Sequence, residues 1–217
     1  MNSIKKVLFY TISCLFVLGL ASCKKDDTLR YNNITMGNLV NGKFISDQGN
    51  TFNMVEMNSS VDLKKFKRGI MNCDVLREVG EKEYDVRVNY MDTVFTKTPI
   101  LASVAAEDPE KTVSDPIHIE QLWFSGGYIN MMITYNAKIG SETKHLVNLV
   151  YSKDEQGRYV LNLRHNAFGE VWTEENSSDM IIGSGYVSFP ITKIVKEDNT
   201  KLVFKWKWHK DVGSRFD

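Results

Sequence analysis

The feature that most constrains the fold of this chain is a strict alternation of apolar and polar residues. In the clearest stretch Tyr84, Val86, Val88 and Tyr90 share one face of a strand, and charged and amide side chains occupy the other. No window of helical periodicity longer than a turn or two accompanies it. The alternation therefore predicts an all-β protein in which each strand buries one face and wets the other.

A tight hairpin is predicted in the second half of the chain. It joins strands at 117–124 and 128–135 through the Ser-Gly-Gly turn at 125–127, whose adjacent glycines supply the positive φ angles that such a turn needs. In the last predicted strand the Phe and Trp side chains are expected to face a core, and the lysines between them to face water. The remaining predicted strands are 146–151, 159–164, 186–189 and 202–208.

The N-terminus has the three-part layout of a secretion signal. Two lysines are followed by an apolar run at 7–20 and by small residues before Cys23, so we expect residues 1–22 to be a removable leader. The apolar run is shorter than the roughly 20 residues of a membrane-spanning helix. The stretch Leu20 to Cys23 resembles the lipobox of bacterial lipoproteins, which implies that the Cys23 thiol carries lipid and anchors the mature chain to a membrane.

A charged stretch follows the anchor, and residues 23–30 are expected to be a solvated tether. Within it Lys25, Asp26 and Asp27 resemble the export signal that sends Bacteroidetes lipoproteins to the outer face of the outer membrane. The resemblance implies an outer-membrane protein that faces the outside of the cell. If these charges serve only as a tether, the alternative is that the protein is anchored on the periplasmic face of the membrane.

The cysteine count and the charge balance limit which disulfides and which partners are expected. Cys14 leaves with the leader and Cys23 carries lipid, so Cys73 is the one thiol left and no intramolecular disulfide can form. Cys73 alternates with apolar neighbours, which indicates an inert core position. Removing the two lysines of the leader leaves 27 − 2 = 25 basic residues against 27 acidic ones, a balance that gives no reason to expect nucleic acid as a partner.

Composition divides the mature chain into two β domains. Residues 99–115 are rich in proline and acids and lack a clear period, so we expect an inter-domain linker there. Residues 31–98 fit a small five-stranded barrel of OB type, and residues 116–217 fit a β-sandwich.

A series of short motifs runs along nearly the whole mature chain: Gly42-Lys43-Phe44 with Asp47, Gly49-Asn50-Thr51-Phe52, Tyr84 to Asn89, Asp115-Pro116-Ile117, Leu122-Trp123, Gly127 to Asn130 and Leu161 to Ala167. Together they resemble the NigD-like lipoprotein family of Bacteroidetes. The resemblance implies an N-terminal OB-type domain followed by a C-terminal β-sandwich. It assigns no catalytic residues, and the family is named for a bacteriocin-associated operon.

The sequence contains no recognisable catalytic, metal-binding or cofactor-binding constellation. The four histidines stand singly, although sheet pairing could bring two of them together at a zinc site. Ser184 lies between glycines without the strand-turn-helix context of a nucleophile elbow. Glu120 and Glu170 read as ordinary strand-edge acids, and a glycosidase would need a carboxylate pair about 5 to 10 Å apart.

Two groups of residues are candidates for ligand binding. Arg164, His165 and Asn166 could together bind a carboxylate or a sugar hydroxyl, and their structural alternative is to hold backbone carbonyls at a corner. Trp123 and Tyr128 could stack on sugar rings, with core packing as their alternative.

The expected function is that of a non-enzymatic, lipid-anchored surface protein that binds an extracellular protein or a glycan. No cofactor is expected. Two alternatives stay open: a bacteriocin-associated, immunity-type lipoprotein, which the family resemblance suggests, and a cryptic glycan hydrolase.

Overall fold

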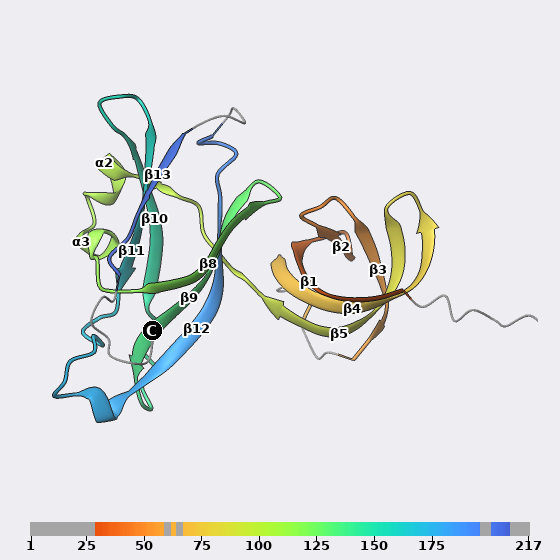
Figure 1. Cartoon of the computed structure of the whole chain (residues 1–217), viewed down its shortest axis with the longest axis horizontal. Helices are drawn as coiled ribbons and strands as arrows, with labels where there is room; N and C mark the ends of the chain where they lie inside the picture. The colour runs from red at the N-terminus through yellow and green to blue at the C-terminus, as the bar shows by residue number, and fades with distance from the viewer. Residues whose placement is uncertain (1–28, 59–61, 64–66, 196–200, 209–217) are drawn as a thin grey trace, which may run out of the picture.

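The computed structural model describes residues 29–58, 62–63, 67–195 and 201–208. The predicted leader at 1–22, the lipid-attachment residue Cys23 and the export residues Lys25, Asp26 and Asp27 lie outside this described part. Figure 1 shows two β units, a barrel and a sandwich, which confirms the predicted all-β class with a barrel followed by a sandwich. Within the described residues, no helix is long and apolar enough to cross a bilayer.

The N-terminal unit is a closed five-stranded barrel with the strand order β1-β2-β3-β5-β4. Strands β3 and β5 run parallel, and the other neighbours are antiparallel. Its core is built around Phe44, Met71, Val75 and Val86, and Cys73 is buried there as expected. The strands are β1 (Leu29–Val40), β2 (Lys43–Ser46), β3 (Thr51–Met57), β4 (Arg68–Gly80) and β5 (Glu83–Thr93).

The predicted alternation of β5 holds for Val86 and Val88 but is wrong for Tyr90. The register between β4 and β5 shifts at Cys73, so that Val88 faces Cys73 and the next pair joins Tyr90 to Asn72. Such a bulge adds one residue and reverses the facing of those that follow. Met91 therefore enters the core at 2% exposure, and Tyr90 is 54% exposed.

Residues 99–115, predicted as a linker, form part of the sandwich instead. They hold β7 (Ile100–Leu101), which pairs with the sandwich strand β10, and two short helices, α2 (Ala102–Ala105) and α3 (Pro109–Thr112), that pack beside β10 and β11. Strand β6 (Phe95–Thr96), inside the predicted barrel domain, pairs with the sandwich strand β12. The barrel also starts earlier than predicted, because β1 begins two residues before residue 31. Each of the two edge strands β6 and β7 is two residues long, which is too short to show alternation in the sequence.

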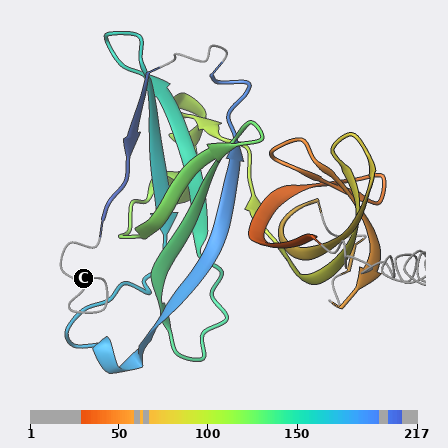
Figure 2. The ribbon, with the colours of Figure 1, turned by 45° about the vertical axis from the view of Figure 1, so that its right-hand side comes forward.

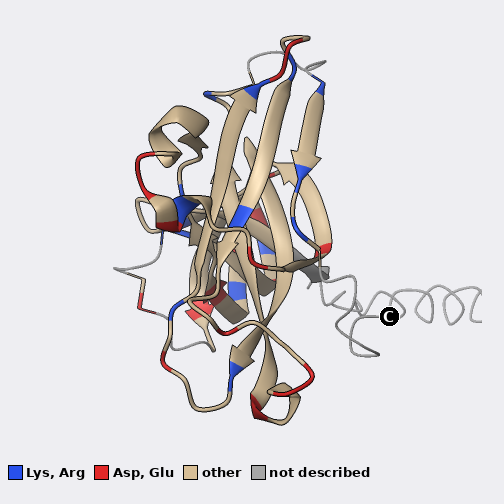
Figure 3. Cartoon of the chain, turned by 90° about the vertical axis from the view of Figure 1, so that its left-hand side faces the viewer, with Lys and Arg blue, Asp and Glu red and all other residues tan. Residues whose placement is uncertain are grey.

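The C-terminal unit is a sandwich of two four-stranded sheets, with the orders β13-β11-β10-β7 and β6-β12-β9-β8. The two layers face each other in Figure 2, and the core between them contains Met131, Leu149, Leu161 and Phe189. Charged residues of both signs lie mostly in its loops and at its strand ends (Figure 3). The strands are β8 (His118–Ser125), β9 (Tyr128–Lys138), β10 (Leu146–Lys153), β11 (Tyr159–Asn166), β12 (Met180–Pro190) and β13 (Leu202–Lys205).

The hairpin of β8 and β9 carries the predicted glycine turn, with φ angles of 56° at Gly126 and 81° at Gly127. Its tip reaches toward the barrel in both ribbon views (Figures 1 and 2). A Cβ atom at Gly126 would collide with the carboxylate of Asp47 on the barrel. The glycine is therefore needed both for the turn and for the close approach of the two domains.

The last strand is shorter than the sequence predicted. Strand β13 ends at Lys205, and the two tryptophans expected in a core, Trp206 and Trp208, are 43% and 52% exposed. Only Leu202 and Phe204 pack against the sandwich core. Alternation shows which residues would share a face of a strand, but it does not show where that strand ends.

Candidate functional site

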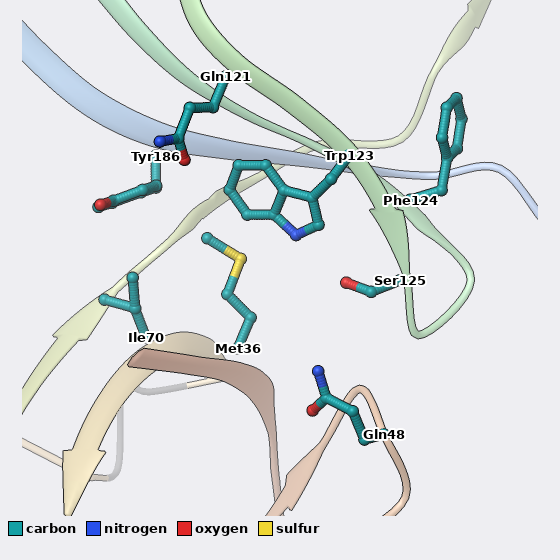
Figure 4. Close-up of a pocket in the computed structure, with 8 residues that line it drawn as sticks. All are labelled: Met36, Gln48, Ile70, Gln121, Trp123, Phe124, Ser125 and Tyr186. Atoms are coloured by element: carbon teal, nitrogen blue, oxygen red, sulfur yellow. The ribbon is translucent and has the colours of Figure 1, made fainter. Parts of the chain in front are cut away.

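A cleft of about 400 Å³ lies between the barrel and the sandwich, and Figure 4 shows its walls. Clefts at domain junctions of this size are frequent sites for small ligands. The barrel contributes Met36, Gln48 and Ile70. The sandwich contributes Gln121, Trp123, Phe124, Ser125 and Tyr186.

Trp123 dominates the sandwich wall of the cleft. It lies on β8 opposite Asn130 of β9, on the sheet face that points away from the sandwich core and toward the barrel. Tyr186 packs edge-on against it with ring centroids 6.5 Å apart, and both rings pack on a small apolar cluster that contains Met36 and Ile70. The indole is thus held in place by its neighbours while part of its surface stays open to the cleft.

The polar groups of the cleft are neutral. Gln48 and Gln121 present amides, whereas the Ser125 hydroxyl is occupied, since it donates to Asp47 and accepts from Asn130 at 3.0 Å. An aromatic face flanked by two amides suits a ligand with an apolar face and a rim of hydroxyls, as a sugar ring has.

A buried ion pair fastens the barrel beneath this cleft. Arg68 of β4 donates from Nη1 and Nη2 to the two carboxylate oxygens of Asp47, both at 2.8 Å, in a bidentate pair. The side chains of Arg68 and Asp47 are 2% and 1% exposed. Burial of such a pair is tolerable only if the remaining donors and acceptors are satisfied.

The sandwich supplies most of those remaining partners. Arg68 Nε donates to Ser188 Oγ at 3.1 Å and Nη2 to Asn130 Oδ1 at 2.9 Å, while Ser125 Oγ donates to Asp47 Oδ2 at 2.5 Å. Within the barrel, Nη1 also reaches Asn38 Oδ1 at 3.5 Å, so all five guanidinium donors face an acceptor. The network therefore joins residues from both domains into one polar core.

Tyr128, a predicted stacking residue, belongs to this network. The guanidinium carbon of Arg68 lies 3.8 Å from the centre of its ring, so the ring stacks on a cation of the protein itself. Tyr128 therefore packs inside the protein, as the structural alternative predicted. For Trp123, stacking on a ligand remains a prediction. Arg68 was missed because it ends a run of basic residues that resembles a solvated face, and nothing in the sequence indicated its partners in the other domain.

The second predicted group divides into one accessible residue and two buried ones. His165 and Asn166 are 2% and 7% exposed, and Arg164 borders a separate hollow with Lys205 and Trp206. His165 Nδ1 donates to the Pro116 carbonyl at 2.9 Å, since a carbonyl can only accept. Asn166 accepts from the amide of Phe168 at 2.9 Å. These two buried side chains hold the backbone at a corner, as the structural alternative had it.

Sheet pairing brings two histidines together. His145 precedes β10 and meets His165 of β11, with Nδ1 of His145 at 3.0 Å from Nε2 of His165. Because His165 donates from Nδ1, its neutral ring accepts at Nε2, so His145 is the donor. Burial lowers the pKa of His165 below its usual 6.5, which favours this neutral form.

Glu170 completes the cluster on the far side of His145, with Oε2 at 3.3 Å from Nε2. The Ser141 hydroxyl, followed by the amide of Lys138, donates to this carboxylate, and these hydrogen bonds lower its pKa from 4.5 to about 2. Each nitrogen of His145 thus has a partner already. No group of three or more potential metal ligands occurs in the described part of the chain.

Comparisons with known proteins agree with this architecture. A family model described as the NigD-like C-terminal beta sandwich domain matches residues 100–215, more than half of the 217 residues. The chain is similar in fold to a NigD-like immunity protein from Bacteroides caccae, with a TM-score of 0.58 at 19% identity over 82% of this chain and 86% of that one. It is also similar to a protein of unknown function from Bacteroides vulgatus, with a TM-score of 0.57 at 18% identity over 76% and 79%. No curated protein matches it.

Proposed function

The chain belongs to the NigD-like family, and from that premise we propose that it is a lipid-anchored, non-enzymatic binding protein that takes a glycan into the cleft between its domains. The observation that carries the proposal is the fixed position of Trp123, with a partly open indole face flanked by the uncharged amides of Gln48 and Gln121. A sugar ring matches that combination of surfaces. A protein partner is the competing ligand class.

The absence of acids from the cavity walls supports binding over hydrolysis. Four cavities in the described part of the chain, including the cleft, are lined without a single carboxylate. Glycoside hydrolysis requires two carboxyl groups facing the scissile bond. Binding without bond cleavage is the simpler use of such walls.

A glycan array probed with the mature chain carrying Cys23→Ser tests the cleft. We expect Trp123→Ala to weaken binding of any glycan hit by about tenfold or more, equivalent to roughly 1.4 kcal/mol or more of lost stacking and burial. Trp206→Ala is the matched control, because that ring is 43% exposed on the sandwich away from the cleft, and its glycan binding should not change. A blank array, or equal losses in the two variants, contradicts a glycan site in the cleft.

The membrane location rests on the lipobox-like stretch that ends at Cys23 and on the charges of Lys25, Asp26 and Asp27. We expect Cys23→Ser to release the protein from the membrane fraction, because two or more acyl chains give stable anchoring and a serine receives none. Protease added to intact cells should digest the wild-type protein if it faces outward from the outer membrane. Complete protection from protease would instead indicate the periplasmic face.

A bacteriocin-associated, immunity-type role is the second candidate, favoured by the structural similarity to a NigD-like immunity protein. Deletion of the gene should then raise sensitivity to bacteriocins made by related strains. Unchanged sensitivity across a panel of such bacteriocins would remove this role and leave the cleft proposal unaffected.

A further inference from the structure

A second cavity of about 390 Å³ opens between the two sheets of the sandwich, separate from the inter-domain cleft. Its floor consists of Ile133, Val147 and Val187, which are 2%, 6% and 4% exposed and belong to the sandwich core. Among the described lining residues, Tyr186 alone borders both cavities, and its ring packs against Trp123 on the cleft side. The volume falls in the range of about 300–1,000 Å³ that small-molecule sites occupy.

Gly185 creates this space. It lies opposite Ile133 in the register of β9 and β12, on the face that points into the core. A Cβ atom built at this position would meet no atom within 4 Å, and the backbone does not need a glycine there. A cavity in a core costs stability in proportion to its volume, so a glycine in the middle of a strand that keeps one open indicates a use for the space.

Two aromatic side chains that line the cavity, Tyr135 and His145, pack against each other. The ring of Tyr135 lies 4.8 Å from that of His145, and a Cβ at Gly183 would come within 2.9 Å of the same tyrosine ring. Both nitrogens of His145 are hydrogen-bonded, to His165 and to Glu170. A ligand in this cavity therefore meets the apolar core residues Ile133, Val147 and Val187, while the imidazole of His145 has no free nitrogen to offer it.

The residues at the mouth of the cavity are exposed and include a charged side chain, unlike the apolar residues of its floor. Lys144 and Thr143 border it and are exposed, beside the ring of Phe95, which is 49% exposed. Lys144 forms no ion pair with any residue in the described part of the chain. The two sheets of a sandwich lie about 10 Å apart, so an apolar cavity between them is narrow. With an unpaired ammonium at its rim, the cavity suits a ligand that has an anionic group at the end of a hydrocarbon chain.

We propose that this cavity binds the hydrocarbon chain of a fatty carboxylate, with the chain over Gly185 and the carboxylate at the Lys144 ammonium. The site does not depend on the inter-domain cleft or on its glycan. Each methylene that enters the cavity should raise the affinity about fourfold, and the gain should end once the cavity is full.

Isothermal titration of the mature chain carrying Cys23→Ser with hexanoate, octanoate and decanoate, below their micellar concentrations, tests the site. We expect one site per chain, with affinity rising from hexanoate to octanoate by about fourfold per methylene. Gly185→Leu should weaken decanoate at least tenfold, while Trp123→Ala should leave it unchanged. Lys144→Gln should weaken decanoate about two- to fivefold and leave decanol unchanged.

Thermal unfolding of each variant separates occlusion from misfolding. If Gly185→Leu proves unstable, Gly185→Ala is the second variant, and it should weaken decanoate while melting no lower than the wild type. Three results would overturn the proposal: no saturable binding of decanoate, decanoate affinity unchanged in both Gly185 variants, or decyltrimethylammonium binding as tightly as decanoate. If phosphatidylglycerol vesicles deplete the wild-type protein from solution but not Gly185→Leu, the bound hydrocarbon chain belongs to a lipid. If the vesicles deplete neither protein, it belongs to a free carboxylate.

Discussion

Replacing Arg68 by methionine is the sharpest test of how the two domains are held together. The change removes the guanidinium and leaves Asp47 buried at 1% exposure with the Ser125 hydroxyl as its remaining side-chain donor. Breaking a buried pair on one side costs about 3–5 kcal/mol, because the other charge stays desolvated without compensation. For a chain of this length that corresponds to a drop in Tm of roughly 6–20 °C.

Arg77→Met is the matched control for this experiment. Arg77 lies on the same strand, β4, and also pairs with an aspartate, with Nη2 at 2.6 Å from Asp85 Oδ2. The Arg77 side chain is 73% exposed, and Asp85, at 9%, keeps the Asn53 amide as a donor at 3.1 Å, so removing Arg77 should destabilise the protein much less than removing Arg68. The difference between the two variants reports how much more an arginine contributes when both partners of its pair are buried.

Denaturant unfolding followed by two probes gives the readout. All four tryptophans are in the C-terminal unit, at residues 123, 172, 206 and 208, whereas far-ultraviolet circular dichroism reports both units. In the wild type the two curves should coincide, and in Arg68→Met they should separate because the sandwich no longer shares a polar core with the barrel. Combining Arg68→Met with Asp47→Ala should cost less than the sum of the single changes. If Arg68→Met is no more destabilising than Arg77→Met, the network does not stabilise the protein in the way described.

The remaining predictions concern the sandwich and the barrel thiol. Gly185→Ala should raise the free energy of unfolding by about 0.4–1 kcal/mol, because the backbone there accepts alanine and the new methyl group enters open space. Gly183→Ala should lower the free energy of unfolding by about 1–3 kcal/mol, because the new methyl group meets the ring of Tyr135. Urea unfolding of the two variants measures both changes. The pKa of Glu170 in the folded protein is about 2, below its usual 4.5, so the stability that the ionised carboxylate contributes is complete above pH 4.5 and is lost as the pH falls toward 2. Glu170→Gln should therefore flatten the acidic part of a plot of Tm against pH. An unchanged slope would contradict the hydrogen bonds assigned to Glu170. Burial raises the pKa of Cys73 to about 11, so iodoacetamide at pH 8 should label it in urea but not in the native protein.

Alternation alone predicted most strands of this fold because it reflects a purely local requirement. The hairpin around Gly126 and Gly127 followed from the residues themselves, since only positive φ angles close so short a turn. The order of barrel and sandwich was predicted from the sizes of the two domains and was also implied by the family resemblance. Alternation failed at Tyr90, where a bulge changes the facing of one strand, and at Trp206, which lies beyond the end of β13 and is exposed.

The candidate site was only partly predictable because its contacts join distant parts of the chain. Trp123 was identified as a possible stacking residue from its type alone. Arg68 was not, because its partners Asn130 and Ser188 follow 62 and 120 residues later and belong to another domain. Asp47 and Asn130 carry part of the family resemblance, yet nothing local in their surroundings indicated that they meet at one guanidinium.

The buried network determines what kind of binding the cleft can support. Separating the barrel from the sandwich would strip Arg68 of Ser188 and Asn130 and expose Asp47 without its Ser125 donor, so each step of opening costs several charge-assisted hydrogen bonds. A hinge that opens and closes around a ligand is therefore disfavoured, and the cleft walls stay in the arrangement of Figure 4 before any ligand arrives. Because little free energy is lost in ordering a preformed wall, even the modest contacts of one indole and two amides can give useful affinity.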